Sequence, residues 1–379
     1  MSGAFAPLSA ADLGGFAIRA ALERAGVAPD EVDHVIMGQV LMAGQGQVPA
    51  RQAAAKAGIP LSVPAVNVNK VCLSGLNAIY QADQMIRAGD AEIVVAGGME
   101  SMTNAPYLAP NARGGFRYGD VALRDAIIAD GLFCAFDNVL MGTSTDQYTG
   151  DSISRAEQDE VAAASHERAA AAIKDGRLAA EITPVSIPQR KGEPIVVDTD
   201  EGVRPGTTAE SLAGLKAAFR DGGTITAGNA SQISDGGSAV IVMSAEAAAR
   251  RGVTPLGEIV SYGMVAGPDN PSLNLQPANA IRKALAKADL DVAGIDLFEL
   301  NEAFAAVGIA SARELGVGLD RVNVNGGAIA LGHPIGMSGN RLALTLLHEL
   351  GRRGGGVGAA ALCGGGGQGD ALIVRVTQG

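Results

Sequence analysis

The segment AIRAALERA at residues 17–25 recurs, with small changes, as AIRKALAKA at residues 280–288. Each copy has the apolar spacing of an amphipathic helix. Each is followed by a short turn and an apolar stretch typical of a strand, at residues 32–37 and 295–300. Alanine-rich helices also resemble one another through composition alone, so the helix by itself is weak evidence for a repeat.

A second pair of similar segments follows in the same order and strengthens the case for an internal duplication. Val-Asn-Val-Asn at residues 66–69 recurs at residues 322–325, and each copy leads through a loop of small residues into a helical pattern. Short apolar runs at residues 92–96 and 358–362 come next, and each ends in a glycine-rich turn, as expected for strands covered on both faces. This alternation predicts two similar α/β/α-layered halves related by a pseudo-twofold axis.

The chain is predicted to have three parts, because 379 residues exceed the roughly 250 to 300 at which single cores stop growing. Residues 1–104 and 235–252 form the N-terminal half, and residues 253–379 form the C-terminal half. Residues 105–234 form an inserted loop domain, since Gly, Pro and polar residues interrupt it around one helical stretch at residues 155–174.

Composition excludes several classes of function. A net charge of -11 disfavours nucleic acids and anionic membrane surfaces, because both repel an acidic protein. The apolar runs are far shorter than the roughly 20 residues that span a bilayer, and the N-terminus shows no targeting pattern, so we expect a cytoplasmic protein. The spacing of the three cysteines and four histidines predicts neither a structural zinc site nor a disulfide framework.

Three reactive side chains are expected to converge where the two halves meet. Cys72 lies where a loop turns into a helix, and a helix N-terminus favours a thiolate, although a buried inert thiol is an equal alternative in this context. His333 follows the equivalent loop of the second half, and a base beside a thiol is one standard activation scheme. Cys363 begins a glycine-rich turn whose N–H groups can stabilise an oxyanion, although plain turns have the same composition.

Asn301 and Glu302 follow the predicted strand at residues 295–300, at the strand end where open α/β sheets form their sites. The two residues also suit a helix cap and a first-turn acid. The sequence context alone favours this structural interpretation.

Four motifs taken together resemble the active-site motifs of the thiolase family, in the same order and with the same spacing. They are CLSG at residues 72–75, NEAF at residues 301–304, GHP at residues 332–334 and CGGG at residues 363–366. The similarity covers nearly the whole chain and includes PARQAA at residues 49–54 and TAGNAS at residues 226–231.

The resemblance implies a thiolase fold, a homodimer or homotetramer, and coenzyme A thioesters as substrates, with no metal and no redox cofactor. The implied reaction condenses two acetyl-CoA molecules, or an acyl-CoA and acetyl-CoA, to a 3-ketoacyl-CoA, and the reverse reaction is thiolysis. The sequence does not determine whether the protein works in synthesis or in breakdown, or the acyl chain length of its substrate.

The resemblance also implies a role for each motif residue. Cys72 is the nucleophile that carries the acyl group, His333 activates it, and Cys363 transfers the second proton. One oxyanion hole is implied at His333 and a water held by Asn301, and the other at the N–H groups of Cys72 and Gly365. Coenzyme A is implied to lie along Leu132, Met141, Arg204, Ser211, Leu215, Ala227, Ser231, Ala303 and Phe304.

Two features depart from the family pattern. Family members begin with a strand and an Arg-Thr-Pro segment, whereas this chain begins Met-Ser-Gly-Ala-Phe at residues 1–5. We therefore expect the first strand to be missing from inside the N-terminal sheet, with reduced stability. Leu140 precedes Met141 where short-chain biosynthetic members commonly have His, which weakens the case for strict acetoacetyl-CoA specificity.

Two alternatives are weaker. A decarboxylating ketoacyl synthase shares the fold but uses two histidines, or a His and an Asn, where this chain has Cys363. A thiolase-like acyl-CoA or lipid-binding protein, or an inactive N-terminally truncated paralogue, is favoured only by the missing strand. The remaining cysteine and histidines match no motif and are predicted to be structural: Cys134, His34, His166 and His348.

Overall fold

The repeated segments form helices α1 (Ala10–Ala25) and α8 (Gln276–Lys287) in the computed structural model, which describes residues 1–377. Helix α1 begins at Ser9, whose hydroxyl accepts the N–H of Asp12 while the Asp12 carboxylate accepts the N–H of Ser9. The helix ends at Gly26 with a φ of 62°, a left-handed conformation that glycine adopts at low cost.

The N-terminal half contains a four-stranded sheet in the order β10-β3-β1-β2. Strands β1, β2 and β3 are parallel, and β10 returns from far along the chain to pair antiparallel with β3. The strands are β1 (His34–Gly38), β2 (Ala65–Val68), β3 (Ile93–Ser101) and β10 (Asp235–Met243).

The C-terminal half contains a second four-stranded sheet, in the order β11-β14-β13-β12. Its strands are β11 (Glu258–Ala266), β12 (Leu297–Leu300), β13 (Gly356–Gly364) and β14 (Gln368–Val376). Val322 forms a single parallel bridge to Phe298, as Ala65 of β2 pairs with Val35 of β1. Strands β12, β13 and β14 therefore correspond to β1, β3 and β10, which confirms the predicted duplication.

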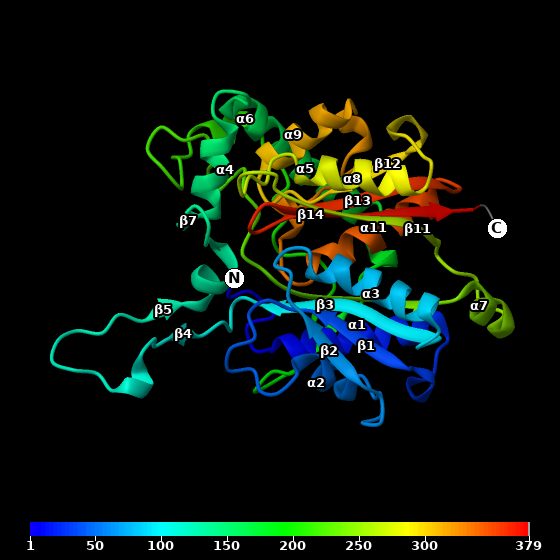
Figure 1. Ribbon diagram of the computed structural model, residues 1–379. Coiled ribbons are helices and arrows are strands. Elements are labelled where there is room, and N and C mark those ends of the chain that lie inside the picture. Colours follow the sequence, from blue (N-terminus) through cyan, green and yellow to red (C-terminus); the bar gives the residue numbers. More distant parts are fainter. Residues whose placement is uncertain (378–379) are drawn as a thin grey trace.

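Helices cover both faces of each sheet (Figure 1). Helices α3 (Ser74–Ala88) and α11 (Ser338–Arg352) lie between the two sheets, where Leu76, Leu342 and Leu346 belong to one buried cluster with residues of both sheets. Helices α1 and α2 (Pro49–Lys56) cover the outer face of the first sheet, and α8 and α9 (Ala305–Leu315) cover that of the second. Double coverage explains why the strands are almost uniformly apolar.

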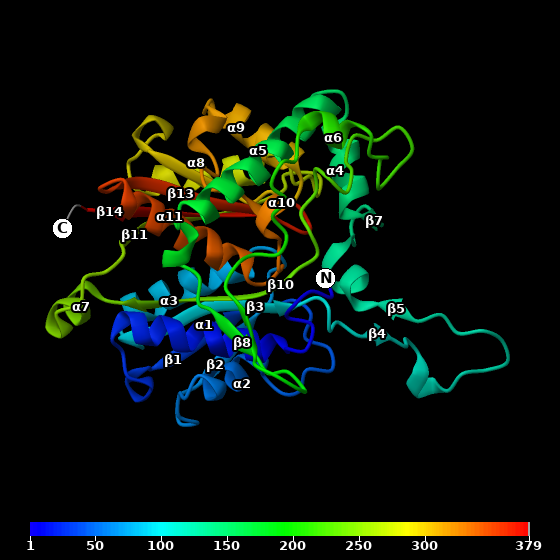
Figure 2. The ribbon, with the colours of Figure 1, turned by 180° about the vertical axis from the view of Figure 1, so that it is seen from behind.

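The segment between β3 and β10 wraps around the two halves (Figures 1 and 2). The helix predicted at residues 155–174 is present as α5 (Arg155–Lys174), with Ser154 and Glu157 forming its capping box. The β4–β5 ribbon projects from the body as an arm (Figure 1). The other elements of this segment are β4 (Tyr107–Leu108), β5 (Arg124–Asp125), a π-helical turn (Ile127–Leu132), β6 (Phe133–Cys134), β7 (Val139–Leu140), α4 (Met141–Thr149), β8 (Val185–Ile187), β9 (Ile195–Val197) and α6 (Ala209–Ala213).

Two short helices complete the fold, α7 (Ala245–Arg251) after β10 and α10 (Ala328–Leu331) before His333. The division into parts at residues 104, 234 and 252 stays a prediction, and residues 378–379 of its last part lie outside the described residues. Over residues 1–377, no helix has the length and hydropathy needed to cross a membrane.

The predicted ends of the buried strands are wrong. Strand β3 continues through Gly97 and Gly98 to Ser101, and β13 includes Cys363 instead of ending before it. A glycine is needed at position 98 inside β3, because the other half packs directly against the strand there. A Cβ on Gly98 would lie 2.4 Å from the carbonyl oxygen of Gly336.

The expectation that a first strand would lie inside the N-terminal sheet is also wrong. In the second sheet β11 pairs with β14 at the sheet edge, so its counterpart in the first sheet would lie at the edge beside β10 and not inside the sheet. Within the described residues, no strand pairs with β10 on that side.

The close contact at Gly98 predicts a stability effect. In Gly98→Ala the added methyl group overlaps backbone atoms of Gly336, so the free energy of unfolding should fall by about 1 to 3 kcal/mol. Gly351→Ala is the matched control, because no heavy atom lies within 4 Å of its Cβ position in α11, and alanine favours a helix. Urea unfolding of both variants measures the difference, and equal midpoints would contradict the packing argument.

Candidate active site

The first turns of α3 and α11 touch almost backbone to backbone. A Cβ on Gly75 would lie 2.8 Å from the amide nitrogen of Asn340, and a Cβ on Gly339 would lie 2.5 Å from that of Leu76. The segments that precede these helices carry Cys72 and His333. The helix contact therefore brings the two segments to the junction of the halves.

Cys72 is buried and free, just before the N-terminus of α3. Burial raises the pKa of its thiol to about 12, although the backbone N–H groups of Cys72 and Gly365 oppose this shift. The preceding residue, Val71, has a φ of 51°, which is rare for a β-branched residue and marks a tight turn at this site. These are the two N–H groups for which the family resemblance implies an oxyanion hole.

Cys363 lies near the end of β13 with none of its surface exposed. Burial raises the pKa of this thiol strongly, and the charge on Cys72 raises it further. The residues beside the two thiols touch, because a Cβ on Gly364 would lie 2.6 Å from the side chain of Leu73. A weakly acidic thiol has a strongly basic conjugate base, a property suited to removing a proton from carbon.

His333 is buried, and burial lowers the pKa of its imidazole to about 4, with the charge of Arg341 acting in the same direction. The ring is therefore neutral at physiological pH. Its Nδ1 lies 2.5 Å from the hydroxyl of Ser338, and its Nε2 lies 3.3 Å from Nδ2 of Asn301. Ile335, two residues along the chain, packs in the same apolar cluster as Cys72.

These contacts select one tautomer of His333. The hydroxyl of Ser338 donates its single proton to the carbonyl of Pro334 at 2.9 Å, so it accepts a proton from His333. Nδ1 therefore carries the hydrogen, and the lone pair on Nε2 accepts a hydrogen bond from Nδ2 of Asn301. A neutral imidazole in this form can act as a base through Nε2.

The interpretation of Asn301 and Glu302 as a helix cap is wrong. Helix α9 begins only at Ala305, and its N-cap residue, Phe304, makes no side-chain cap hydrogen bond. The amide N–H of Asn301 instead continues the pairing of β12 by donating to Ala361. This backbone hydrogen bond fixes Asn301 at the end of the strand, where its side chain reaches the imidazole of His333.

Glu302 is a structural anchor for the segment that leads to His333. Its carboxylate accepts hydrogen bonds from the hydroxyl of Ser165, the side-chain amide of Asn323 and the N–H of Ile329. The carboxylate therefore holds the second Val-Asn-Val-Asn copy against α5 and α10.

Glu100 is a buried acid that the sequence did not single out. Its carboxylate accepts the N–H groups of Val40, Leu41 and Gly336, and so connects a loop of the first half to the turn after His333. Burial raises the pKa of this carboxyl to about 7, although the three N–H donors favour the charged form. A single Glu at the end of an apolar strand is the sequence feature that could have indicated Glu100.

Four of the residues predicted to contact coenzyme A lie close to the two thiols. Met141, Ala303 and Phe304 share a buried cluster with Cys363, and Leu132 packs against the cluster of Cys72. Phe219, which the sequence did not indicate, belongs to the first cluster and meets Phe304 edge to face at 5.9 Å. These residues form the inner end of the predicted binding path.

The other predicted contacts lie outside these buried clusters. The N–H of Ser231 donates to the carbonyl of Ala303, and a Cβ on Gly228 would touch Leu215. The predicted outer positions are exposed on the surface: Arg204, Ser211, Leu215 and Ala227. The predicted set therefore includes both exposed and buried residues, and its use for coenzyme A binding stays a prediction.

The remaining cysteine and histidines match no catalytic motif. Cys134 is buried in β6, in the same apolar cluster as Cys363, and its sulfur accepts the N–H of Asp137. His166 accepts the N–H of Arg204 through Nδ1, and His34 and His348 are partly buried. Across residues 1–377, no group of three or more His, Cys, Asp or Glu side chains has a geometry that could hold a metal ion.

Comparisons with known proteins identify the family. The acetyl-CoA acetyltransferase of Pseudomonas aeruginosa is 53% identical over 98% of this chain and 95% of its own length. A probable acetyl-CoA acetyltransferase of Mycolicibacterium smegmatis is 59% identical over 99% of this chain and 97% of its own length. The crystal structure of the Bacillus anthracis acetyl-CoA acetyltransferase superposes with a TM-score of 0.95 at 41% identity, covering 99% of this chain and 95% of that one.

Family models agree with these relatives over almost the whole chain. Residues 1–246 match the model of the thiolase N-terminal domain, and residues 253–376 match that of the thiolase C-terminal domain. The chain belongs to the thiolase family.

Proposed function

We propose that the protein is an acetyl-CoA C-acetyltransferase, which condenses two acetyl-CoA molecules, or an acyl-CoA and acetyl-CoA, to a 3-ketoacyl-CoA and catalyses the reverse thiolysis. The observation that carries this proposal is the meeting of two buried thiols, Cys72 and Cys363, with the neutral imidazole of His333 at the junction of the halves. The names of the relatives support the same reaction.

The first step transfers an acetyl group to Cys72. A thiol with a pKa near 12 is uncharged at neutral pH, so it needs a base, and the unprotonated Nε2 of His333 is the proposed one. The sulfur attacks the thioester carbonyl while its proton passes to the imidazole, and the departing coenzyme A sulfur takes that proton. The N–H groups of Cys72 and Gly365 stabilise the oxyanion, and each such donor typically contributes about 3 kcal/mol.

The second step forms the carbon-carbon bond. The thiol of Cys363 first gives its proton to Nε2 of His333, and the resulting thiolate removes a proton from the methyl carbon of a second acetyl-CoA. The enolate attacks the acetyl carbonyl on Cys72. The bond to Cys72 then breaks, and its sulfur takes the proton back from Nε2 of His333. While it carries that proton, Nε2 of His333 is the proposed donor that stabilises the enolate oxygen, together with the water that Asn301 is predicted to hold.

Several features of the proposal rest on the family resemblance. Coenzyme A is proposed to enter past Arg204, Ser211 and Leu215, and the chemistry is proposed to need neither a metal nor a redox cofactor. We also propose that the enzyme acts in the cytoplasm. Leu140, partly buried at the end of β7 beside Met141, supports a preference broader than acetoacetyl-CoA.

A homodimer or homotetramer is proposed as the working assembly. The arm between β4 and β5 supports an assembly, because it carries large exposed apolar side chains at Tyr107, Phe116, Tyr118 and Leu123. Apolar side chains that gather on a projecting segment commonly mark a protein-protein contact.

The alternative of a non-catalytic acyl-CoA-binding protein or truncated paralogue is less well supported. Such proteins have no need of two thiols and an imidazole held in a reactive arrangement. The chain also matches 95% or more of the length of its acetyltransferase relatives.

The two thiols should affect different half-reactions. Cys363→Ala should retain exchange of the acetyl group between coenzyme A molecules, which needs only Cys72 and His333, but should lose condensation by roughly 10⁴-fold or more. Cys72→Ala should lose both reactions. Cys134→Ala is the control, because it removes a buried thiol that packs in the same cluster as Cys363 but matches no catalytic motif, and it should keep both reactions. Loss of exchange in Cys363→Ala would contradict the division of roles.

The tautomer of His333 should depend on Ser338. In Ser338→Ala the imidazole loses its hydrogen-bond partner at Nδ1, so the kcat of condensation should fall about tenfold. The rate of coenzyme A exchange should fall with it. Ser311→Ala is the control, because that buried hydroxyl in α9 bonds only to the carbonyl of Asn274. Unchanged kcat in Ser338→Ala, with a normal unfolding midpoint, would show that Ser338 does not position the ring.

The arm should determine the size of the assembly. The double variant Phe116→Ser and Tyr118→Ser removes two exposed apolar side chains, so its mass in solution should fall relative to the unchanged protein. Leu61→Ser, which changes an exposed apolar residue outside the arm, serves as the control. Sedimentation velocity measures the mass, and identical masses for all three proteins would exclude the arm from the interface.

A further inference from the structure

A buried ion pair joins the two halves beside the proposed site. Nζ of Lys70, in the loop between β2 and α3, lies 2.7 Å and 3.0 Å from the two carboxylate oxygens of Asp370 in β14. The Asp370 side chain is fully buried, and the Lys70 side chain is 20% exposed. Because burying two charges costs much of what their attraction gains, such a pair adds little net stability. The pair does hold together the two segments that carry it.

Tyr262 of β11 holds the carboxylate of Asp370 from the C-terminal half. Its hydroxyl donates to Oδ2 of Asp370 at 2.6 Å, and its ring stacks on Tyr80 of α3 with the ring centroids 4.5 Å apart. Burial raises the pKa of the Asp370 carboxyl, and the hydrogen bond and charge of Lys70 oppose this shift. The charged form of Asp370 therefore depends on Lys70.

Lys70 is anchored to the turn that carries Cys72. Its N–H donates to the hydroxyl of Ser74 at 2.8 Å, and that hydroxyl donates to the carbonyl of Val71 at 2.6 Å. These hydrogen bonds connect residues on both sides of Cys72. A displacement of Lys70 would therefore displace Cys72 as well.

Asp370 is anchored to the hairpin that carries Cys363. Strands β13 and β14 pair antiparallel, with Leu362 opposite Asp370 and Cys363 opposite Gly369. Asp370 is thus one residue from the position that faces Cys363. The ion pair therefore connects the loop of one thiol to the hairpin of the other.

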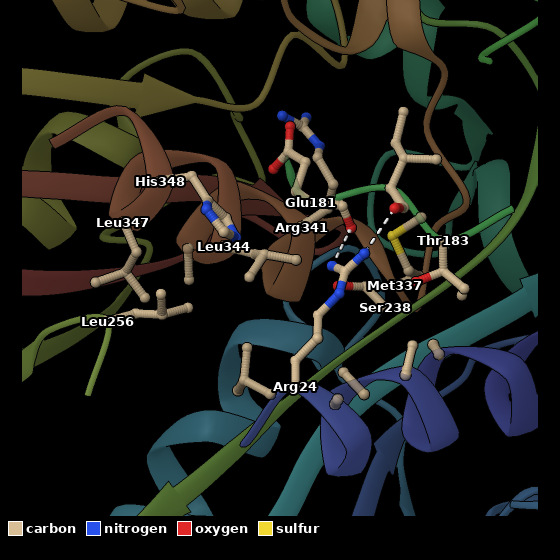
Figure 3. A pocket seen from close by; sticks show the side chains of 18 of the residues that line it. Arg24, Glu181, Thr183, Ser238, Leu256, Met337, Arg341, Leu344, Leu347 and His348 are labelled. Carbon is tan, nitrogen blue, oxygen red and sulfur yellow. Dashed lines mark hydrogen bonds between the residues drawn. The ribbon is translucent and has the colours of Figure 1, made fainter. Parts of the chain in front are cut away.

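The ion pair is separate from a large cavity beside β10. That cavity has a volume of about 1360 Å³, and Arg341, Leu344 and His348 are among the residues that line it (Figure 3). Neither Lys70 nor Asp370 lines it. Opposite charges attract more strongly away from water, so the position of the pair favours a firm connection between the two segments.

We propose that Lys70 and Asp370 are positioning residues, which hold the Cys72 loop and the Cys363 hairpin at the separation that carbon-carbon bond formation needs. This inference rests on the proposed function, in which Cys72 acts in both steps and Cys363 acts only in the second.

The two steps depend on the hairpin to different degrees. Transfer of the acetyl group to Cys72 depends on it only through the N–H of Gly365. Bond formation depends on it a second time, because Cys363 must also reach the methyl carbon of the second acetyl-CoA. A displacement of about 1 Å can slow a reaction by about 10²-fold. A loosened hairpin should therefore slow condensation more than coenzyme A exchange.

The test compares the two reactions in a double variant, Lys70→Met with Asp370→Asn. Both charges are then absent, and the new amide oxygen can still accept the hydroxyl of Tyr262, so no unpaired charge stays buried. Condensation should fall about thirtyfold and exchange about threefold. Both rates are measured on the same preparation, so their ratio does not depend on the fraction of folded protein.

Two single variants separate positioning from general stability. Lys70→Arg keeps a cation that can pair with both oxygens of Asp370, so condensation should stay within about threefold of that of the unchanged protein. Lys287→Met is the matched control, because the Lys287 ammonium donates to the carbonyl of Tyr262 at 2.7 Å within the C-terminal half. Both reactions should keep their rates in this control.

Three results would overturn the inference. Condensation could keep its rate in the double variant, or condensation and exchange could fall by the same factor, which would exclude an effect on the separation of the thiols. Alternatively, Lys70→Arg could lose as much condensation as the double variant, which would exclude the ion pair as the cause. Absence of both reactions in the unchanged protein would instead overturn the proposed function, on which this inference rests.

Discussion

The structure depends on the contact between the first turns of α3 and α11. Gly75 and Gly339 leave no room for side chains there, so backbone meets backbone across the pseudo-twofold junction. Glu100 reinforces the contact by accepting N–H groups from a loop of the first half and from Gly336 in the second. Because Cys72 and His333 immediately precede these helices, the contact that joins the halves also assembles the proposed site.

Burial at this junction determines the chemistry. Removing His333 from water lowers the pKa of its imidazole to about 4 and keeps it available as a base, whereas the same burial raises the pKa of the Cys72 thiol to about 12. Neither group is charged at rest, which avoids the cost of burying an ion. A proton can thus move from sulfur to nitrogen when substrate arrives, with backbone N–H groups already in place for the oxyanion.

The sequence predicted features that depend on local pattern or on motif order. The duplication, α5, and the two strands that precede Asn301 and Cys363 follow from periodicity and repetition. Tertiary contacts decided the rest: Gly97 and Gly98 are accommodated inside β3 because a partner backbone lies against them, and Glu100 gains its role from atoms far along the chain. The edge position of β11 in the second sheet required the pairing order of the strands, which no single stretch of sequence specifies.

The central claim is that Cys72 carries the acetyl group between the two coenzyme A molecules. Acid quenching of the protein shortly after it is mixed with acetyl-CoA, followed by peptide mass spectrometry, tests this claim most directly. The account predicts one acetyl group on the peptide that contains Cys72 and none on those that contain Cys134 or Cys363. An acetyl group on Cys363 instead, or turnover with no acetylated cysteine, would contradict it.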